Sequence, residues 1–533
     1  MRDTSIILSV ALVGSLGVVA WGIGGYAPWA TLVLELSAIA LTGGLIAGVL
    51  GRTSRAEHRQ NLAIARSRRR VFGKRPTADV EILSPLEREG TSSANETSGP
   101  YPDPFYMLGY PFRRVGIGLG IVALTLWIGA SLVPLPLTWL TWWSPKAFEL
   151  RSEVSGLLEN EALTAFAPSS LTPFFSYQAL LLWLAYAMLF WVSYHVADSS
   201  RAVRRLSLGL VFVGVASCAY GLVQWLSRLS SAVDEARVAD YLTTGSFGNR
   251  NHYALFQEML LLVSLGWLVL RSGEAGRRAR DRASAQEAKA RTALIAAGTV
   301  CIALGLLFSF SRSGISFAII AGAFFFYATR NPSRKSRRVL VVPALFLLAG
   351  ALWIGIDPLV SRFSLAPEEL TLEGDGRATV WRDSLGAVSD FWLTGSGLGS
   401  FRHVYPIYRS FGGRRFYSWA HNDYLQLAVE LGLPGLLLIG LVIFWIVRRG
   451  ARVRTSLEGQ RGLRDLHAGY CAAALAVGLH SFTDFGLHLP ANAALLAVVL
   501  GVVTGLTPKR RSRENKVDAH PHRRKLRRSP PAA

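Results

Sequence analysis

The sequence predicts an all-α fold, a polytopic bundle of transmembrane helices joined by loops. Of the 533 residues, 51% are hydrophobic and 17% are charged, whereas a soluble globular chain has about 25% charged residues. The hydrophobic residues form blocks, and many blocks approach the roughly 20 residues that a helix needs to cross the hydrocarbon core of a bilayer. Lysine and arginine lie in short runs between these blocks. The composition therefore predicts a multi-pass membrane protein.

The hydrophobic blocks predict about twelve spans, of which the first two form an N-terminal transmembrane hairpin within residues 1–50. No clear cleavage site follows the first block, so we interpret it as a retained span and not as a signal peptide. The predicted spans are Ser5–Tyr26, Trp29–Leu50, Val115–Leu135, Phe174–Val196, Leu206–Leu226, Tyr253–Leu270, Ala293–Phe310, Ile315–Thr329, Val339–Ile356, Tyr424–Val447, Ala468–Phe485 and Pro490–Leu506.

Every second loop between these spans is strongly basic, and the positive-inside rule places such loops in the cytoplasm. With twelve spans, all the basic loops and both termini lie on that side, whereas one missed span would divide them between the two sides. The basic runs lie within 52–75, 201–205, 271–282, 330–338, 448–454 and 509–528. This distribution, and not nucleic-acid binding, accounts for the net charge of +22.

The regions outside the first hairpin divide into four parts. Residues 51–112 are predicted to be a basic cytoplasmic linker, because 91–104 is rich in Ser, Thr, Gly, Asn and Pro. Transmembrane helices follow over 113–244, and a second membrane domain covers 245–506. Residues 507–533 are predicted to be a disordered, basic cytoplasmic tail that contacts anionic lipid. The cysteines lie inside hydrophobic blocks, so neither a disulfide framework nor a metal site follows from them.

Three predicted outer loops are long enough to carry chemistry: 136–173, 227–252 and 357–423. The first contains Trp139, Trp142 and Trp143, which are more typical of an interfacial aromatic belt than of a sugar-binding platform. The third breaks the charge rule, which indicates either an anionic ligand or the tolerance of long loops for charge during translocation. Its basic residues are Arg362, Arg377, Arg382, Arg402, Arg409, Arg414 and Arg415.

Two further positions in or beside the outer loops, Arg312 and His421, are candidate functional residues. Arg312 lies in a short predicted turn between two spans, where a charge near the bilayer must be paired or must snorkel to water. His421 precedes Asn422 and Asp423 at the start of a span, and either of these residues can cap the helix. A neutral imidazole at such a helix mouth suits a general base. A purely structural role would explain the position of Arg312 or of His421 equally well, when each is considered alone.

Taken in order, several short motifs resemble those of the O-antigen ligase and polymerase superfamily. Residues 248–254 read Gly-Asn-Arg-Asn-His-Tyr-Ala, and residues 311–314 read Ser-Arg-Ser-Gly. Arg377 and Trp381 are followed by the glycine-rich segment 395–401. Residues 420–425 read Ala-His-Asn-Asp-Tyr-Leu, with Glu-Leu-Gly-Leu-Pro-Gly at 430–435. The order, spacing and outer-side placement of the motifs carry the resemblance, which covers roughly residues 245–490.

The resemblance implies a C-type glycosyltransferase fold and transfer of a glycan from a polyprenyl diphosphate carrier to a lipid or glycan acceptor at the periplasmic face of the bacterial inner membrane. It implies no cofactor and no metal. It makes His421 the catalytic residue and makes Arg312, Arg377 and Arg250 contacts of the diphosphate. Asn422, Asp423 and Tyr424 would support the site. The glycine-rich segment is not a dinucleotide site, because no strand precedes it.

Two alternatives remain open on the sequence. A polymerase would use the same donor to lengthen a lipid-linked polysaccharide, so the acceptor alone separates it from a ligase. A membrane transporter would share the twelve-span layout with both termini inside. Against the transporter, inverted repeats are not evident and few carboxylates lie in the spans to relay ions. The main ones are Glu35, Glu258, Glu430 and Asp484.

Overall fold

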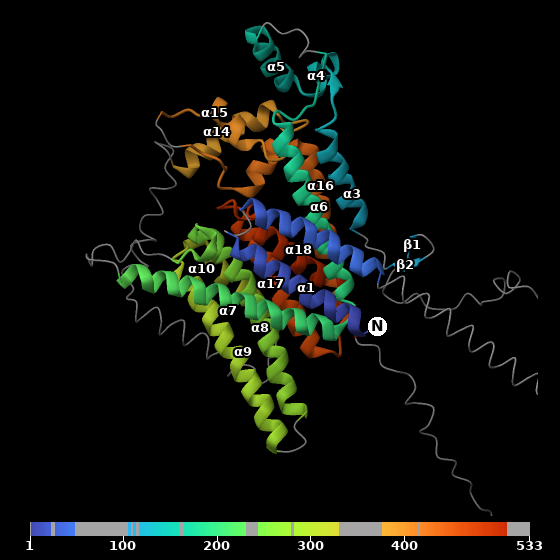
Figure 1. Cartoon of the computed structure of the whole chain (residues 1–533), viewed down its shortest axis with the longest axis vertical. Coiled ribbons are helices and arrows are strands. Elements are labelled where there is room, and N and C mark those ends of the chain that lie inside the picture. The colour runs from blue at the N-terminus through green and yellow to red at the C-terminus, as the bar shows by residue number, and fades with distance from the viewer. Residues whose placement is uncertain are drawn as a thin grey trace, which may run out of the picture.

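The structure is a computed structural model that describes residues 2–22, 27–47, 105–107, 110–112, 117–158, 165–230, 243–278, 282–329, 376–412 and 416–508. Most of the described residues are in α-helices that pack side by side (Figure 1). Six described helices are long and apolar enough to cross a membrane, and four shorter ones are also apolar. The chain is therefore an all-α, polytopic membrane protein, as the sequence predicts.

Helix α8 (Arg250–Arg278) occupies the centre of the bundle, because 94% of its most apolar stretch is buried. Helix α17 (Arg461–His480) crosses α8 where two glycines meet, and a Cβ on Gly469 would lie 3.0 Å from the Cα of Gly266. Small residues let helix backbones approach this closely inside a membrane. Three more helices pack against α8: α7 (Ser200–Ser230), α9 (Arg282–Phe308) and α10 (Arg312–Ala328).

The remaining long helices form the outer part of the bundle. Helix α18 (Pro490–Gly505) packs against α6 (Pro173–Val196), and α16 (Asp423–Ser456) packs against both α18 and α3 (Gly118–Ala130). The first hairpin consists of α1 (Arg2–Trp21) and the helix Pro28–Ala47. Within the predicted linker, the described residues form an antiparallel pair of short strands, β1 (Phe105–Met107) and β2 (Tyr110–Phe112).

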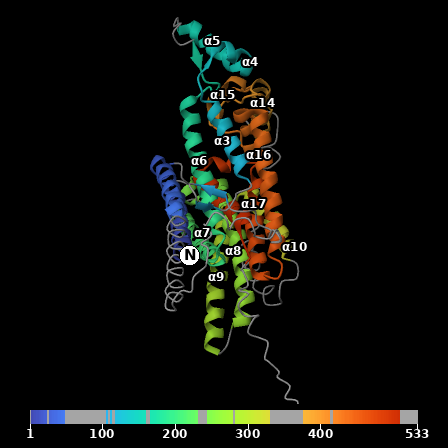
Figure 2. The same cartoon turned by 90° about the vertical axis from the view of Figure 1, so that its right-hand side faces the viewer.

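A helical cap lies at one end of the bundle, at the top of Figures 1 and 2. It contains α4 (Leu137–Trp143), α5 (Pro145–Leu158), α14 (Arg377–Asp390) and α15 (Phe401–Tyr408). The paired strands β3 (Leu135–Pro136) and β4 (Phe166–Ala167) lie at the base of α4 and α5. A hydrophobic cluster joins the cap to α16 through Ala147, Val380, Phe391, Phe401, Tyr405 and Val429. The predicted outer loops are thus partly folded, which hydrophobic periodicity alone did not indicate.

The end of the bundle opposite the cap gathers basic residues. The helices α16 and α17 meet there in the turn 457–460, and the Arg454 side chain donates a hydrogen bond to the carbonyl of Ala328 at the end of α10. This arrangement agrees with one basic face of the bundle. The twelve-span count remains a prediction, because Val339–Ile356, most of the linker and almost all of the tail lie outside the described residues.

The structure corrects several predicted boundaries. The arginines at 201–205 lie on α7, and those at 448–454 lie on α16, because both helices extend past their apolar stretches. Arg312 is the first residue of α10 and not part of a turn. Helix α17 ends at His480, so residues 481–485, predicted to end a span, form a loop. Apolar runs mark the membrane core but not the helix ends, which depend on caps and tertiary contacts.

Candidate active site at the junction of four helix starts

Four helices begin around one loop, residues 481–489 between α17 and α18. Helix α8 starts at Arg250, α10 at Arg312, α14 at Arg377 and α16 at Asp423. Each helix start presents backbone N–H groups that have no acceptor within the helix, together with the positive end of a macrodipole. Three of the four starts also carry a predicted diphosphate-binding arginine. Each of these helix starts therefore favours a nearby anion.

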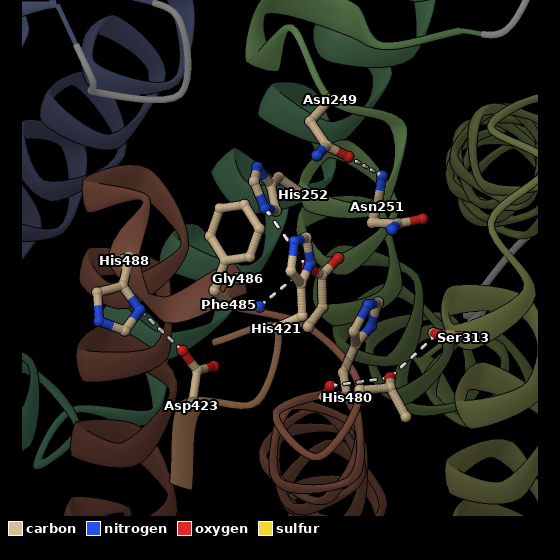
Figure 3. A network of polar contacts seen from close by, with 12 residues as sticks. Asn249, Asn251, His252, Ser313, His421, Asp423, His480, Phe485, Gly486 and His488 are labelled. Atoms are coloured by element: carbon tan, nitrogen blue, oxygen red, sulfur yellow. Dashed lines mark hydrogen bonds and ion pairs between the residues drawn. The ribbon is translucent and has the colours of Figure 1, made fainter. Parts of the chain in front are cut away.

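Hydrogen bonds join the loop between α17 and α18 to three of the four helices near their starts. The backbone N–H of Asp423 donates to the carbonyl of Ser481 at 2.9 Å. The Arg377 guanidinium donates to the carbonyl of Thr483 at 2.9 Å. The Thr483 hydroxyl donates to the hydroxyl of Ser313, beside Arg312, at 3.0 Å. These contacts bring motifs that are far apart in the sequence to one place (Figure 3).

Asp484 completes the junction, because its carboxylate lies between two imidazoles. Its Oδ1 atom is 3.7 Å from Nδ1 of His421 and 3.8 Å from Nε2 of His252 on α8. Burial raises the pKa of Asp484. The combined effect of His421, His252, His480 and Arg377 is larger and opposite, so the pKa lies well below its usual range. Asp484 is therefore ionised at neutral pH. The side chain of Asp484 is 1% exposed and that of His421 is 26% exposed, so only the imidazole is open to a ligand.

The backbone holds His421 in an unusual conformation. Its φ angle is 54°, in the left-handed region that side-chain-bearing residues seldom adopt. Phe310, just before Ser311 and Arg312, has a φ angle of 49°. Strained backbone of this kind persists where the surroundings impose it, and it concentrates at functional sites. Both strained residues immediately precede helix starts at the junction.

Side-chain caps fix where these helices start. The Asn422 side chain accepts a hydrogen bond from the N–H of Leu425 at 3.1 Å and caps α16. The Ser311 side chain accepts one from Gly314 at 3.2 Å, and its hydroxyl donates to the Asn251 side chain on α8. Of the two predicted caps of α16, Asn422 is thus the cap, and Asp423 is the first helical residue.

The remaining supporting residues anchor α16 to its neighbours. Asp423 accepts a hydrogen bond from Nδ1 of His488 at 2.9 Å. The Tyr424 hydroxyl donates to the carbonyl of Gly478 on α17 at 2.8 Å. Both side chains therefore hold the helix that carries His421 in place. The Phe485 ring, 4.9 Å from the His421 ring and 4.5 Å from the His252 ring, packs between the two imidazoles.

A second buried pair lies next to the junction, on the side of the bundle core. His480 at the end of α17 and Glu258 on α8 are 3.0 Å apart, and both side chains are almost fully buried. Figure 3 shows His480 near His421 and Ser313. Among the described residues, no group of three or more His, Cys, Asp and Glu side chains is arranged to hold a metal ion.

The glycine-rich segment 395–399 has a structural role. Gly395, Gly397 and Gly399 all have positive φ angles, and a Cβ on Gly395 would lie 2.2 Å from the carbonyl oxygen of Glu430. The Glu430 carboxylate accepts hydrogen bonds from the backbone N–H groups of Gly399 and Phe401. The segment thus wraps around a buried carboxylate of α16.

The structure places the predicted site residues as follows. Arg377 and His421 lie beside one carboxylate, that of Asp484. Arg312 neighbours Ser313, and Arg250 is two residues before His252. Sequence reasoning named Asp484 only as a carboxylate inside a span, and it did not single out His252, His480 or Thr483. An ionisable residue at membrane depth is itself a signal of function, and it could have identified Asp484.

Comparison with known proteins gives one family match. The family model described as O-antigen ligase matches residues 297–440. The matched segment contains Arg312, Arg377 and His421, whereas Arg250, His252 and Asp484 lie outside it. No curated protein matches the chain. Residues 297–440 are therefore similar to the O-antigen ligase family, which supports the resemblance seen in the sequence motifs.

Proposed function

We propose that the protein is a membrane glycosyltransferase that moves a glycan from a polyprenyl diphosphate carrier to an acceptor hydroxyl at the periplasmic face. The observation that carries the proposal is the convergence of one imidazole, a buried carboxylate and four helix starts, three of them bearing an arginine, on a single loop. This junction matches the needs of the reaction, which are a base for the hydroxyl and a cationic site for the leaving diphosphate.

The base is His421. The acceptor oxygen attacks the anomeric carbon, the bond from that carbon to the diphosphate oxygen breaks, and its electron pair leaves with the lipid diphosphate. The hydroxyl proton passes to the imidazole of His421, an effect worth roughly 10²–10⁴-fold in rate. The Asp484 carboxylate, 3.7 Å from Nδ1 of His421, then stabilises the imidazolium and keeps the opposite nitrogen free for the acceptor.

The diphosphate site consists of Arg250, Arg312 and Arg377. Guanidinium groups stay charged and present a planar fork that contacts two phosphate oxygens at once. The macrodipoles of the same helices add fixed positive potential where negative charge develops. The Arg377 guanidinium also donates to the carbonyl of Thr483, which orients it before the donor binds.

The test is transfer by purified variants with a polyprenyl-diphosphate-linked oligosaccharide as donor. We expect Arg312→Ala and Arg377→Ala each to abolish transfer at normal protein abundance. Arg382→Ala is the matched control, because Arg382 lies on the same helix as Arg377 but its half-exposed side chain pairs with Asp383 and Ser410 in the cap. Full activity of either junction variant would exclude the diphosphate site.

Two further variants test the base and its carboxylate. We expect His421→Ala to abolish transfer. Asp484→Asn should lower kcat by roughly 10²-fold or more with a small change in the KM for donor. A shift in donor KM alone would mean that Asp484 organises the arginines and does not act through His421.

Ligase and polymerase activity differ in the acceptor and not at this junction. The alternative to a ligase is a polymerase that lengthens an O-antigen or exopolysaccharide chain with the same donor. Offering the purified protein a lipid-linked polymer and lipid A core in parallel separates the two activities. A capped lipid A core identifies a ligase, and a longer lipid-linked chain identifies a polymerase.

A further inference from the structure

A second imidazole, that of His252 on α8, faces the carboxylate of Asp484. Its Nε2 atom is 3.8 Å from Oδ1 of Asp484, and the two side chains are 5% and 1% exposed. This distance is longer than a hydrogen bond, although contacts at a catalytic site often tighten only when substrate binds. The same Nε2 atom makes no hydrogen bond within the described part of the chain. Because buried polar atoms are almost always paired, the carboxylate lies where this nitrogen needs an acceptor.

Contacts with α18 and with the loop 481–489 fix the position of His252. Nδ2 of Asn492, near the start of α18, donates hydrogen bonds to the carbonyls of His252 and Gly486 at 3.2 Å and 3.1 Å. The Phe485 ring meets the His252 ring edge-on, at 4.5 Å between centroids and 76° between planes. Figure 3 shows His252, Phe485 and His421 close together. The start of α8 is thereby tied to the loop between α17 and α18.

The Asp484 carboxylate determines which nitrogen of each imidazole carries a proton. Ionised carboxylate oxygens only accept hydrogen bonds, so Nε2 of His252 and Nδ1 of His421 both carry a proton on the side of Asp484. Oδ1 of Asp484 also accepts the backbone N–H of Phe485 at 2.9 Å. Two imidazoles and one fixed amide therefore share a single oxygen atom.

Sharing the carboxylate weakens its effect on His421. A carboxylate beside an imidazole favours the protonated imidazolium, and each donor to that carboxylate stabilises its charge and reduces the attraction. A general base must be unprotonated when the acceptor arrives, so it works best when it titrates near the working pH. Asp484 alone would keep His421 protonated over a wider pH range. A donor from His252 narrows that range.

We propose that His252 is a positioning residue that shares the Asp484 carboxylate with His421, and that it thereby keeps the His421 imidazole free to accept a proton at neutral pH. The proposal rests on the proposed function for the role of His421 as the base. His252 is buried, and the Phe485 ring packs between the two imidazoles. His252 therefore acts on His421 through Asp484.

Other ionisable groups at the junction contribute to the same equilibrium. Among the described residues, α18 contributes none. A substitution of His252 leaves all of these groups in place, so a change in the protonation of His421 reports the contact between His252 and Asp484. The groups are Arg250 and Glu258 on α8, Arg312 on α10, Arg377 on α14, Asp423 on α16, His480 on α17, and His488 in the loop 481–489.

Chemical modification measures the protonation of His421 without any transfer reaction. Diethyl pyrocarbonate acylates unprotonated imidazoles, and the side chain of His421 is 26% exposed, so the reagent reaches it. The reagent is added to the purified full-length protein in detergent across a pH series, and mass spectrometry quantifies the modified peptides. The midpoint of the pH dependence reports the protonation of His421. His403, an exposed histidine of the cap, is the internal control.

Two substitutions of His252 separate the loss of the donor from other effects. His252→Phe keeps a ring against Phe485 but has no N–H. We expect it to move the His421 midpoint to higher pH by about one unit, as loss of one donor to a charged group predicts. His252→Gln keeps an N–H at the position of Nε2, and we expect it to retain the wild-type midpoint. The His403 midpoint should stay unchanged in both variants.

Two results would overturn the proposal. One is an equal His421 midpoint in the wild type and in His252→Phe. The other is an equal displacement in His252→Phe and His252→Gln, because packing and not the donor would then control His421. If His252→Phe fails to fold, His252→Leu takes its place, since leucine also lacks the donor and adds no ring.

The pH profile of transfer connects this contact to catalysis. The acid limb of kcat/KM reports the base of the free enzyme. We expect His252→Phe to lower kcat/KM about tenfold below that limb, the factor for one pH unit, and to approach wild type above it. A uniform loss at every pH would mean a purely structural role and would contradict the proposal. Absence of transfer by wild-type protein with every acceptor would refute the proposed function and leave the modification result standing.

Discussion

At the scale of single residues, the site depends on a strained histidine held beside a buried carboxylate. The left-handed φ angle of His421 aims its imidazole at Asp484, just before Asn422 caps α16. A residue with a Cβ loses roughly 1–2 kcal/mol in this conformation compared with a right-handed one. The surrounding contacts of α16 must therefore offset this cost, which glycine would not incur.

A pair of substitutions at this position separates strain from catalysis. His421→Gly and His421→Ala both remove the imidazole, so we expect both to lose transfer activity. The glycine variant should unfold at a higher temperature than the alanine variant, by the equivalent of about 1 kcal/mol, because glycine adopts a positive φ without a Cβ clash. Thermal denaturation in the same detergent measures the difference. Equal midpoints would mean that the backbone relaxes once the imidazole is gone.

The sequence identified some of these residues and not others, for a physical reason. His421, Arg312 and Arg377 stand in local motifs, so a short stretch of sequence suffices to single them out. The role of Asp484 depends on its distance from His421 and His252, which lie in other parts of the chain. Only packing creates such a relation. His480 and Glu258 were missed as a pair for the same reason, since each alone is an isolated polar residue in an apolar stretch.

At the scale of elements, a kink in α16 joins the bundle to the cap. Gly432 has φ 64° and ψ −176°, and Pro434 lacks the N–H that the carbonyl of Glu430 would otherwise accept. Gly397 donates its N–H to that carbonyl at 3.0 Å, and Leu433 donates to the carbonyl of Trp392 at 2.7 Å. The kink thus exposes backbone groups that fix the cap segment carrying α14 and Arg377.

Alanine substitutions on α16 test the importance of the kink. Gly432→Ala should destabilise the protein by about 1–3 kcal/mol, because the Gly432 conformation is open almost only to glycine. A Cβ there would also lie 2.8 Å from Trp392 and Gly395. Gly440→Ala is the control: a Cβ there meets no atom within 4 Å, and alanine should stabilise the helix by about 0.5–1 kcal/mol. Thermal denaturation compares the two variants, and similar midpoints would refute the role assigned to the kink.

Hydrophobic periodicity predicted the membrane-spanning helices but not the helices of the cap. The cores of most described spans fall inside observed helices, because burial in lipid requires long apolar runs. The cap helices α4, α5, α14 and α15 were predicted as loops, because their sequences mix polar and apolar residues. Their order comes from a shared cluster around Phe391, Phe401 and Tyr405 and from the kink of α16. Such tertiary contacts leave little trace in a window of sequence.

At the scale of the whole molecule, the proposed active site and the basic turn between α16 and α17 lie at opposite ends of the bundle. The junction and the cap occupy one end of the bundle, and the turn 457–460 with Arg448, Arg449, Arg452 and Arg454 nearby occupies the other. The positive-inside rule then predicts that the basic end lies in the cytoplasm and the junction on the opposite side of the membrane. A diphosphate donor could reach His421 only after its headgroup had crossed the membrane. The orientation is therefore part of the proposed function and can be tested apart from catalysis.

Single cysteines at the two ends report the orientation. Trp142 on α4 is 80% exposed in the cap, and Glu458 is exposed in the turn between α16 and α17. In spheroplasts, a membrane-impermeant maleimide should label Trp142→Cys directly and Glu458→Cys only after permeabilisation. Wild-type protein is the background control, since its three cysteines lie within helices α7, α9 and α17. The reverse pattern would place His421 and its arginines in the cytoplasm, where the positive-inside argument fails and a periplasmic transferase is impossible.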